Sequence, residues 1–458
     1  MQSSQNIYRQ TDPRGPAAGG SSITTMSLPK TQGMFERAQK ITPGGVHSNI
    51  RYIDPHPLYF SKARGSRVWD LDGTEYVDCI VNFGACILGH GHPSVLESVK
   101  NQLDSGLTCG AETQLSVEVS ERLNKMVPCA ETVRFACTGT DAVMHALMIA
   151  RGYTGRDKIL KIEGGFDGWY DSVLVGTSPS FNATDQGTDF ADASDSAGIP
   201  KNAAQNTMVV PYNNTEALAN VVEKHRNELA AVILEPVAFN MGCVLPKEGY
   251  LKSVRKITEE NDVLLIFDEV ITGFRVAPGG AQQYFGITPD LATFAKAIAN
   301  GFPLSVVAGK REIMQISRPG GKVAYMGTYN GSQAPLAAAS ATLEILQDGS
   351  VQEQLRKSTD KLRNGFSQIC KEVDVPARLQ GMAGQFQVYF TNEEIRDYKQ
   401  VLTVDKEKFM KFQKEMLGQR ILFLPKTLFH HGISAAHNDE DIETILKAMR
   451  TAMRNLIS

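Results

Sequence analysis

The sequence contains few cysteines and no long apolar run. Its 458 residues include 7 cysteines, an odd number, and none of them forms a Cys-x-x-Cys pair. Scattered unpaired thiols are typical of a reducing compartment and exclude a small disulfide scaffold. The clearest apolar runs, residues 229–234 and 263–267, are far shorter than the ~20 residues that cross a membrane. We therefore expect a cytoplasmic protein that has no membrane partner.

An excess of charge of one sign is also missing. The 47 lysines and arginines nearly balance the 50 acidic residues, which gives a formal charge of −3. Proteins that bind nucleic acids usually show a basic excess, so a nucleic-acid partner is not expected. The chain is several times longer than a domain of ~150 residues, which predicts two or more domains. Residues 1–30 are rich in Ser, Gln, Gly, Pro and Thr, and we expect them to form a disordered tail.

Short β-branched runs alternate with amphipathic stretches along most of the chain. This alternation predicts an α/β fold with a mainly parallel sheet covered by helices on both faces. Two alternating runs around Asp72-Gly73 predict a hairpin. After about residue 335 the pattern changes to long helices, which indicates a second, smaller α/β domain. Strands are expected at 133–136, 158–162, 207–210, 230–234 and 263–267, and helices at 115–127, 141–153, 216–229 and 249–260.

Two charged positions stand where such a sheet binds ligands, at the carboxyl ends of strands. Asp268 and Glu269 follow an apolar run, and because neighbouring strand residues point to opposite faces, at most one of them enters a given pocket. The carboxylate that enters the pocket would hold a cationic partner. Alternatively, Asp268 and Glu269 merely form the exposed end of the strand. Lys296 has apolar and small neighbours. A lysine buried there has a lowered pKa and suits Schiff-base chemistry, whereas one that snorkels from a helix end does not.

Other motifs suggest an anion site and a stacking surface. The turn Thr138-Gly139-Thr140 follows a predicted strand and opens a helix, so it either binds an anion or simply caps the helix. It is neither a Walker loop nor a GxGxxG fingerprint, which argues against a dehydrogenase. The ring of Phe166, on a glycine-rich turn, either stacks on a heteroaromatic ligand or packs in the core. The histidine pairs lack the further ligands that zinc needs, so no metal is expected.

Taken together, these stretches resemble class III, fold-type I aminotransferases that use pyridoxal 5′-phosphate (PLP). The closer likeness is to the glutamate-1-semialdehyde 2,1-aminomutase subgroup, and it runs from about residue 34 to residue 457. Each motif alone is weak, but the ordered set is specific. The motifs are PGGVHSNIR (43–51), WDLDGTEYVD (69–78), LGHGHP (88–93), RFACTGTDA (134–142), LEPVAFNMG (234–242), FDEVITGFR (267–275), TPDLATFAKAIANGFP (288–303) and MGTYNG (326–331).

The resemblance implies two domains of the fold-type I architecture. A large PLP-binding domain, residues 76–335, would contain a mainly parallel sheet of the seven-stranded type between helices. A smaller α/β domain would be formed by residues 336–458, with residues 31–75 packed against it. The family also implies a homodimer whose subunits share their active sites.

The resemblance assigns the cofactor chemistry to Lys296 and Asp268. Lys296 would bind PLP as a Schiff base and, once substrate displaces it, carry the proton between substrate and cofactor. Asp268 would face the pyridine nitrogen and keep it protonated, which makes the ring an electron sink. Phe166 would stack on the ring, and Asn240 would lie near the ring hydroxyl group.

Further matched positions imply contacts with phosphate and substrate. The turn Thr138-Gly139-Thr140 would bind the phosphate, and Thr328 would reach the phosphate from the neighbouring subunit. Arg51 matches the arginine that clamps the substrate carboxylate, a task that suits a planar bidentate group.

Three positions depart from the aminomutase pattern. Phe83 stands where aminomutases usually carry a tryptophan, and Phe429 and His430 stand near the position of their glutamate. Because these residues surround the expected substrate pocket, that pocket is remodelled. We expect a class III aminotransferase that moves an amino group between a carboxylate-bearing amino acid or amine and a 2-oxo acid. The alternative is an intramolecular transfer of the glutamate-1-semialdehyde 2,1-aminomutase type.

Overall fold

The structure of the chain is a computed structural model that describes residues 28–107, 110–177, 188–189 and 195–457. The predicted tail, 1–30, lies outside the described residues except for its last three positions. There helix α1 (Pro29–Gln39) begins, with a proline in its first turn, where the missing N–H group costs nothing. The predicted tail therefore extends too far by two residues, because Pro29 already belongs to the helix.

A mixed sheet of eight strands forms the centre of the molecule, in the order β4-β11-β10-β9-β8-β5-β7-β6. The pairs from β10 to β7 are all parallel, whereas β11 and the two-residue β6 run antiparallel to their neighbours. The predicted mainly parallel sheet of seven strands is thus confirmed, with β6 added at one edge. The strands are β4 (Thr132–Ala136), β5 (Lys158–Ile162), β6 (Thr188–Asp189), β7 (Thr207–Val210), β8 (Leu229–Leu234), β9 (Leu264–Glu269), β10 (Leu291–Phe294) and β11 (Ser305–Gly309).

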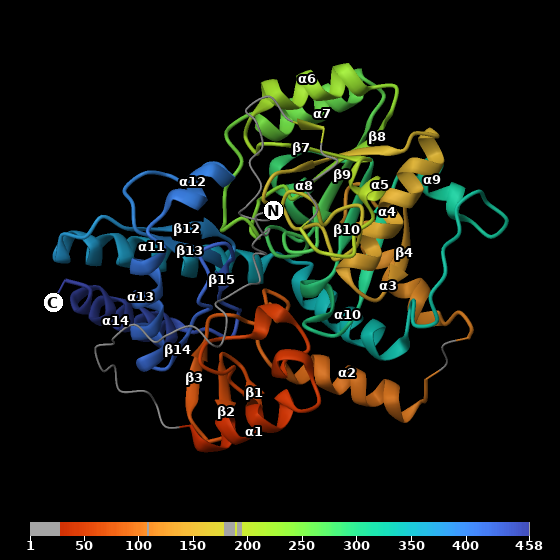
Figure 1. Ribbon diagram of the computed structural model, residues 1–458. Helices are drawn as coiled ribbons and strands as arrows, with labels where there is room; N and C mark the ends of the chain where they lie inside the picture. The colour runs from red at the N-terminus through yellow and green to blue at the C-terminus, as the bar shows by residue number, and fades with distance from the viewer. Residues whose placement is uncertain (1–27, 108–109, 178–187, 190–194, 458) are drawn as a thin grey trace.

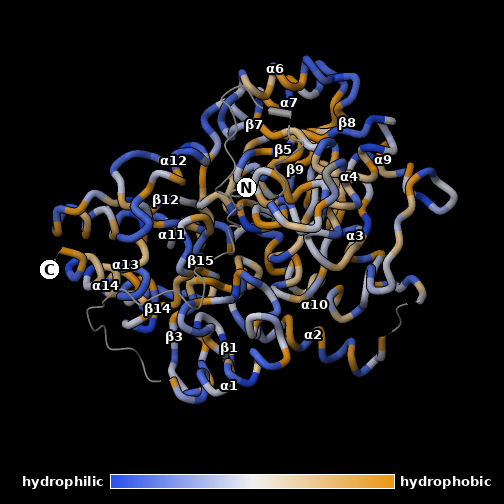
Figure 2. Tube along the Cα trace, in the orientation of Figure 1, coloured by the Kyte–Doolittle hydropathy of each residue, from blue (hydrophilic) through white to orange (hydrophobic). Residues whose placement is uncertain are grey.

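Helices cover both faces of this sheet, as predicted. Alternate residues of β8 enter different apolar cores: Ile233 packs with helix α4, and Val232 packs with helices on the opposite face. Figure 2 shows the central strands as hydrophobic tubes, while the helices around them carry hydrophilic residues on their outer sides. The larger helices here are α2 (Pro93–Asp104), α3 (Gln114–Met126), α4 (Gly139–Thr154), α6 (Thr215–His225), α7 (Tyr250–Glu260) and α10 (Gln333–Leu346), with the shorter α5 (Lys201–Ala204), α8 (Gly280–Phe285) and α9 (Arg311–Met314).

The C-terminal part forms a second layer of helices over a small sheet, drawn in blue in Figure 1. Strands β12 and β13 pair as a hairpin, and β15 adds to β13. The elements are α11 (Ser350–Val373), β12 (Arg378–Met382), β13 (Gln385–Tyr389), α12 (Tyr398–Thr403), α13 (Lys406–Gly418), β14 (Ile421–Leu422), β15 (His431–Gly432) and α14 (Asp439–Asn455).

The N-terminal segment shares a sheet with the C-terminal part. Its strands β1 (Phe60–Arg64), β2 (Arg67–Asp70) and β3 (Glu75–Asp78) are antiparallel, which confirms the predicted hairpin at Asp72-Gly73. Strand β14 then pairs in parallel with β3, and Figure 1 shows β14 lying above the red and orange β1–β3. The domain boundaries themselves stay a prediction.

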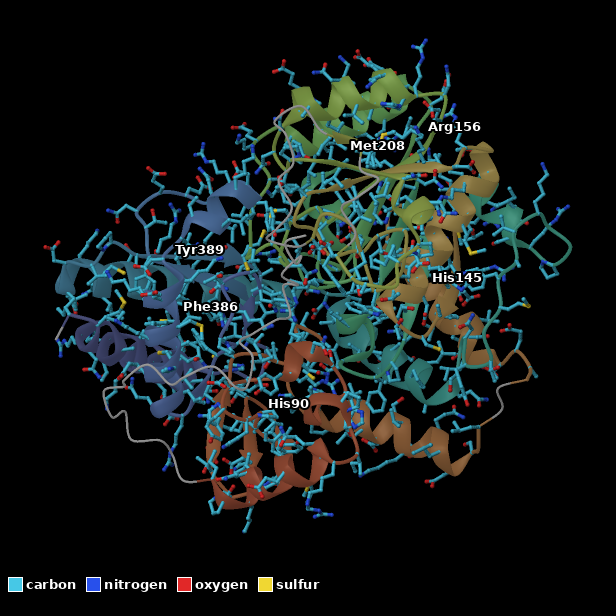
Figure 3. All side chains as sticks on the ribbon, in the orientation of Figure 1. His90, His145, Arg156, Met208, Phe386 and Tyr389 are labelled. Atoms are coloured by element: carbon cyan, nitrogen blue, oxygen red, sulfur yellow. The ribbon has the colours of Figure 1, made fainter. Side chains whose placement is uncertain are left out.

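Single side chains join these parts. The hydroxyl group of Tyr389, on β13, donates to the carbonyl oxygen of Gly242, 2.6 Å away in the loop after β8. His90 lies 2.7 Å from the carboxylate of Asp78, the last residue of β3. Figure 3 labels both Tyr389, in the blue part, and His90, in the orange part. Tyr389 therefore attaches the sheet of β12, β13 and β15 to the loop after β8. His90 attaches β3 to the segment that leads into α2.

The sequence patterns missed β10 and β11. Both strands are short and buried on both faces, and a short apolar run without alternation does not reveal its period. Their pairing is non-local, since it is set by β9 and β4. Six cysteines in the described part of the chain are unpaired, as the composition predicts. Within the same residues, no helix is long and apolar enough to cross a membrane.

Asp290 ties β10 to its surroundings at the amino end of the strand. Its carboxylate accepts from Arg255 (2.9 Å), from Lys310 (2.6 Å) and from the N–H group of Leu265 (2.8 Å). Burial alone would raise the pKa of Asp290, but these partners hold it below its usual value. The stabilisation is therefore present above the pKa of the unfolded state and is lost as pH falls through the folded-state pKa.

We predict that Asp290→Asn lowers the free energy of unfolding by about 2 kcal/mol at pH 7, because a buried, charge-assisted network loses its acceptor. Urea unfolding of both proteins at pH 7 and at steps from pH 4 down to pH 2 measures this, and the difference should shrink only at the acid end, below the usual carboxyl pKa. A difference that stays the same down to pH 2 would contradict the role of the ionised carboxylate.

Candidate active site

A cavity of about 550 Å³ lies at the carboxyl ends of the central strands. Phe166, Asn240 and Lys296 enter it from the loops that follow β5, β8 and β10, as expected for a parallel sheet. Segments distant in sequence complete the wall. The remaining lining residues are His47, Ser48, Asn49, Ile50, Phe83, Trp169 and Phe429.

Lys296 lines this cavity and does not snorkel from a helix end. It follows β10 with a left-handed backbone (φ 50°), and its neighbours Ala297 and Ile298 are fully buried. Burial lowers the pKa of Lys296 to about 8, although Glu235 and Asp268 oppose the shift. A substantial share of this amine is therefore neutral, and so nucleophilic, near neutral pH.

Asp268 and Glu269 point in different directions at the end of β9, as alternation predicts. Asp268 is buried and accepts from the N–H group of Val270 (2.9 Å) and the hydroxyl of Thr293 (3.3 Å). Glu269 instead accepts from the N–H group of Ala281, at 2.5 Å. Burial, followed by repulsion from another carboxylate, raises the pKa of Asp268 to about 7, while Lys296 lowers it.

Glu235 is a further buried carboxyl group, just after β8. Its carboxyl oxygen accepts from the side-chain amide of Asn240 at 3.1 Å. Burial and then repulsion from Asp268 and Asp167 raise the pKa of Glu235 to about 8, whereas Lys296 lowers it. Glu235 therefore shares the surroundings of Lys296 with Asp268.

Sequence reasoning missed two charged residues here, Asp167 and Lys161. Lys161 is fully buried on β5, and its amine lies 3.5 Å from the carboxylate of Asp167. The sequence held one indication: a lysine stands inside the apolar strand KILKI, where only a buried partner makes it tolerable. The pair belongs to the same end of the sheet as Asp268.

The turn Thr138-Gly139-Thr140 opens helix α4. The hydroxyl of Thr138 accepts from the N–H group of Asp141, and the Asp141 carboxylate accepts from the N–H group of Thr138, so the predicted cap is present. Among the described residues, nothing accepts from the N–H groups of Gly139 and Thr140. These two N–H groups, at the positive end of a helix of 16 residues, suit an anion such as a phosphate.

Three predicted site residues lie away from this cavity. Arg51 is exposed and lines a neighbouring cavity of about 300 Å³, which shares Phe83 with the first. His430 is buried behind Phe429, where its ring bonds to the side chain of Gln385. Thr328 is exposed on a surface segment. A single chain therefore brings together Lys296, Asp268, Phe166, Asn240, Phe83 and Phe429. The predicted turn Thr138-Gly139-Thr140 does not line the cavity but contacts Trp169, which does. Arg51, His430 and Thr328 are not brought to this cavity.

Comparison with known proteins decides the family. The sequence model described as aminotransferase class-III matches residues 51–449. The chain belongs to the class III aminotransferases. It is 43% identical to a glutamate-1-semialdehyde 2,1-aminomutase of Methanococcoides burtonii, and the match covers 92% of this chain and 98% of that protein.

Solved structures share the fold. An omega-transaminase from Sphaerobacter thermophilus matches with a TM-score of 0.87 at 29% identity, covering 93% of this chain and 98% of that one. The FumI protein of a Sphingopyxis species, solved with its PLP attached, matches with a TM-score of 0.81 at 25% identity, covering 93% and 96%. The predicted fold and the predicted cofactor, PLP, are both confirmed.

The residues of this class III enzyme fit that cofactor. Asp167, Glu235 and Asp268 are buried together at this end of the sheet. Burial, and then the repulsion among them, raises the pKa of Glu235 and Asp268, so a further positive charge such as a protonated ring nitrogen would be stabilised there. Lys296 supplies the amine that a cofactor aldehyde needs. The free N–H groups that begin α4 supply a phosphate site. In the described residues, no group of His, Cys, Asp and Glu side chains is arranged to hold a metal ion.

We predict that the apoprotein attaches added PLP faster as pH rises and that the rate levels off above about pH 8, because the neutral amine of Lys296 is the reacting form. At pH 7 about one-tenth of this amine is neutral, against far less than about one-hundredth of an exposed lysine. Stopped-flow absorbance measures the rate. Lys296→Arg should show no attachment, and an attachment rate that still rises steeply at pH 10 would contradict the assignment.

Proposed function

We propose that this protein is an aminomutase of the glutamate-1-semialdehyde type, which moves an amino group between neighbouring carbons of one substrate. The observation that carries the proposal is the 43% identity to such an enzyme over nearly the whole of both chains. From the sequence motifs alone we expected an intermolecular aminotransferase. The relatives support the alternative better, because curated proteins that match nearly the whole chain are glutamate-1-semialdehyde 2,1-aminomutases. Such an enzyme needs no separate 2-oxo acid.

In this proposal Lys296 and Asp268 do most of the protein's chemical work. PLP, when bound, supplies an electron sink for the carbanion that forms at the substrate carbon. Lys296 moves the proton, a task that suits an amine whose pKa lies near 8. Asp268 would hold a proton at the ring nitrogen, since it is a buried carboxyl that another carboxylate, Asp167, repels.

The cavity walls orient the ring and exclude water. Phe166 offers an aromatic face, and Asn240, held by Glu235, offers an amide toward the ring hydroxyl. Phe83 and Phe429 meet edge to face, with ring centroids 6.4 Å apart. This aromatic pair narrows the cavity, which helps the site keep its substrate while the amino group moves. The phosphate would lie at the Thr138-Gly139-Thr140 turn.

We predict that the holoenzyme converts glutamate-1-semialdehyde into 5-amino-4-oxopentanoate with no added 2-oxo acid. Chromatography of the products measures this, and Lys296→Ala should lose at least about 1,000-fold in rate because no other amine lines the described cavity. A protein that turns over only when a 2-oxo acid is added, and that passes the amino nitrogen to that acid, would contradict the proposal.

A second candidate is the intermolecular aminotransferase. The specific observation in its favour is the neighbouring apolar cavity of about 300 Å³, which reaches Arg51 past the shared side chain of Phe83. Such a cavity suits an amino donor that is larger than a five-carbon semialdehyde and bears a carboxylate. The product analysis above separates the two candidates, since only this one needs an acceptor.

The proposal also includes a homodimer with shared sites, in the cytoplasm. The exposed segment around Thr328 supports the dimer, because its apolar neighbours Met326 and Tyr329 are 80% and 65% exposed. Exposed apolar groups of this kind mark surfaces that a partner covers. The unpaired cysteines support a reducing compartment.

We predict that the holoenzyme sediments at about twice the chain mass of 50.1 kDa. Thr328→Val should weaken the affinity for PLP about tenfold, because one hydrogen bond to a charged phosphate is lost. Equilibrium dialysis measures the affinity, and Ser332→Ala, four residues further on, serves as the control. The shared site would be contradicted if the protein sediments as a monomer and Thr328→Val binds PLP as tightly as Ser332→Ala does.

A further inference from the structure

The proposed chemistry leaves one buried ion pair without a task. Asp167 follows Phe166, whose ring lines the cavity, and the Asp167 side chain is only 2% exposed. Its nearest cation is the amine of Lys161, at 3.5 Å. Lys161 also donates to the carbonyl oxygens of Gly165 (2.7 Å) and Val175 (3.0 Å), so its position is fixed. The pair is built into the protein behind the wall of the cavity.

The loop that carries Asp167 is held in place on its other side. Gly168 has a φ of 117°, and a Cβ atom there would lie 3.1 Å from the Cα atom of Thr140. The N–H group of Trp169 donates to the hydroxyl of Thr140 at 3.1 Å. This loop therefore runs in contact with the turn that begins α4. These contacts on both sides of the loop fix the backbone next to the buried Asp167.

The order of the strands brings Asp167 to the side of Asp268. Strands β5, β8 and β9 are parallel neighbours, and Asp167, Glu235 and Asp268 lie at or just after their carboxyl ends. Three adjacent strands span about 10 Å, so the three carboxyls lie within the range of strong electrostatic coupling. In agreement with this placement, Asp167 raises the pKa of both other groups, although burial is the larger cause for each.

We propose that Asp167, kept in place by Lys161, is a second anionic group beside Asp268 that holds the proton on the ring nitrogen of the cofactor. Asp167 does not line the described cavity, so we assign it as a positioning residue. The inference rests on the assignment of Lys296 and Asp268 to the cofactor in the proposed function, and it holds for either candidate reaction. A protonated ring is the better electron sink, and two carboxylates hold the proton more firmly than one.

The other charged groups near the ring have different partners. Glu235 is bound to Asn240 and faces Lys296. Arg275 is fully buried and donates to the carbonyl oxygens of Gly84 and Ala383, on the side of His430.

Asp167 differs from Glu235 and Asp268 because the amine of a lysine, Lys161, lies within 4 Å of its carboxylate. In the described part of the chain, Lys161 makes no other ion pair. Burial raises the pKa of Asp167, and Lys161 opposes the shift. When Asp167 takes up a proton in acid, its support of the ring proton disappears. The pair therefore sets how the cofactor's protonation depends on pH.

The test follows the ring nitrogen itself. Apoprotein is loaded with PLP carrying nitrogen-15 in the ring, and magnetic resonance then reports the proton on that nitrogen as pH is raised. Asp167→Asn should lose this proton at a pH lower by about one unit, a tenfold weaker hold, because one neighbouring negative charge is gone. Asp167→Glu keeps the charge and should restore the midpoint.

Asp290→Asn is the matched control, because it removes a buried carboxylate at the opposite end of β10. It should lower stability and leave the midpoint unchanged. If Asp167→Asn does not fold, the smaller Asp167→Ser replaces it and should show the same shift.

Equal midpoints in the unaltered protein and in Asp167→Asn would overturn the proposal. So would a neutral ring nitrogen in the unaltered holoenzyme at pH 7, which requires no variant. The experiment needs no turnover, so a wrong substrate assignment leaves its result intact. A failure of the cofactor assignment itself would show separately, as protein that binds no labelled PLP.

Discussion

Three carboxyl groups that repel one another are buried at one end of the central sheet, and the chemistry of the site follows from this repulsion. Asp167, Glu235 and Asp268 meet there because β5, β8 and β9 are parallel neighbours, and Lys161 and Lys296 lie close to them. Buried carboxylates that repel one another cost several kcal/mol, so protons or a bound cation must compensate them. The raised pKa values of Asp268 and Glu235 are one form of compensation, and the protonated ring of PLP is the other.

The fold makes this arrangement stable by placing apolar cores on both faces of the sheet. Helix α4 closes one core, and its N-terminal turn contacts Trp169, which lines the cavity. Two aromatic residues of the cavity wall come from other segments. Phe83 follows the N-terminal hairpin, and Phe429 precedes β15. Because β14 pairs with β3, these two distant segments form one unit. A change in that unit alters the size of the cavity without touching Lys296.

Much of this architecture can be predicted from the sequence, and the exceptions have physical causes. Lys296 and Asp268 are recognisable through the ordered set of family motifs, because each residue alone also fits a snorkelling lysine or the plain end of a strand. Strands β10 and β11 are not recognisable, since short strands buried on both faces show no alternation. His430 looks like a pocket residue in sequence, yet a bond to Gln385, 45 positions away, holds it behind Phe429. Only the folded chain reveals such a contact.

The most direct test of the account is to locate the cofactor on the chain. Holoenzyme is reduced with borohydride and digested, and mass spectrometry then identifies the lysine that carries the pyridoxyl group. We expect the pyridoxyl group on Lys296, the lysine that lines the cavity. A pyridoxyl group on Lys161, or on any exposed lysine, would contradict it.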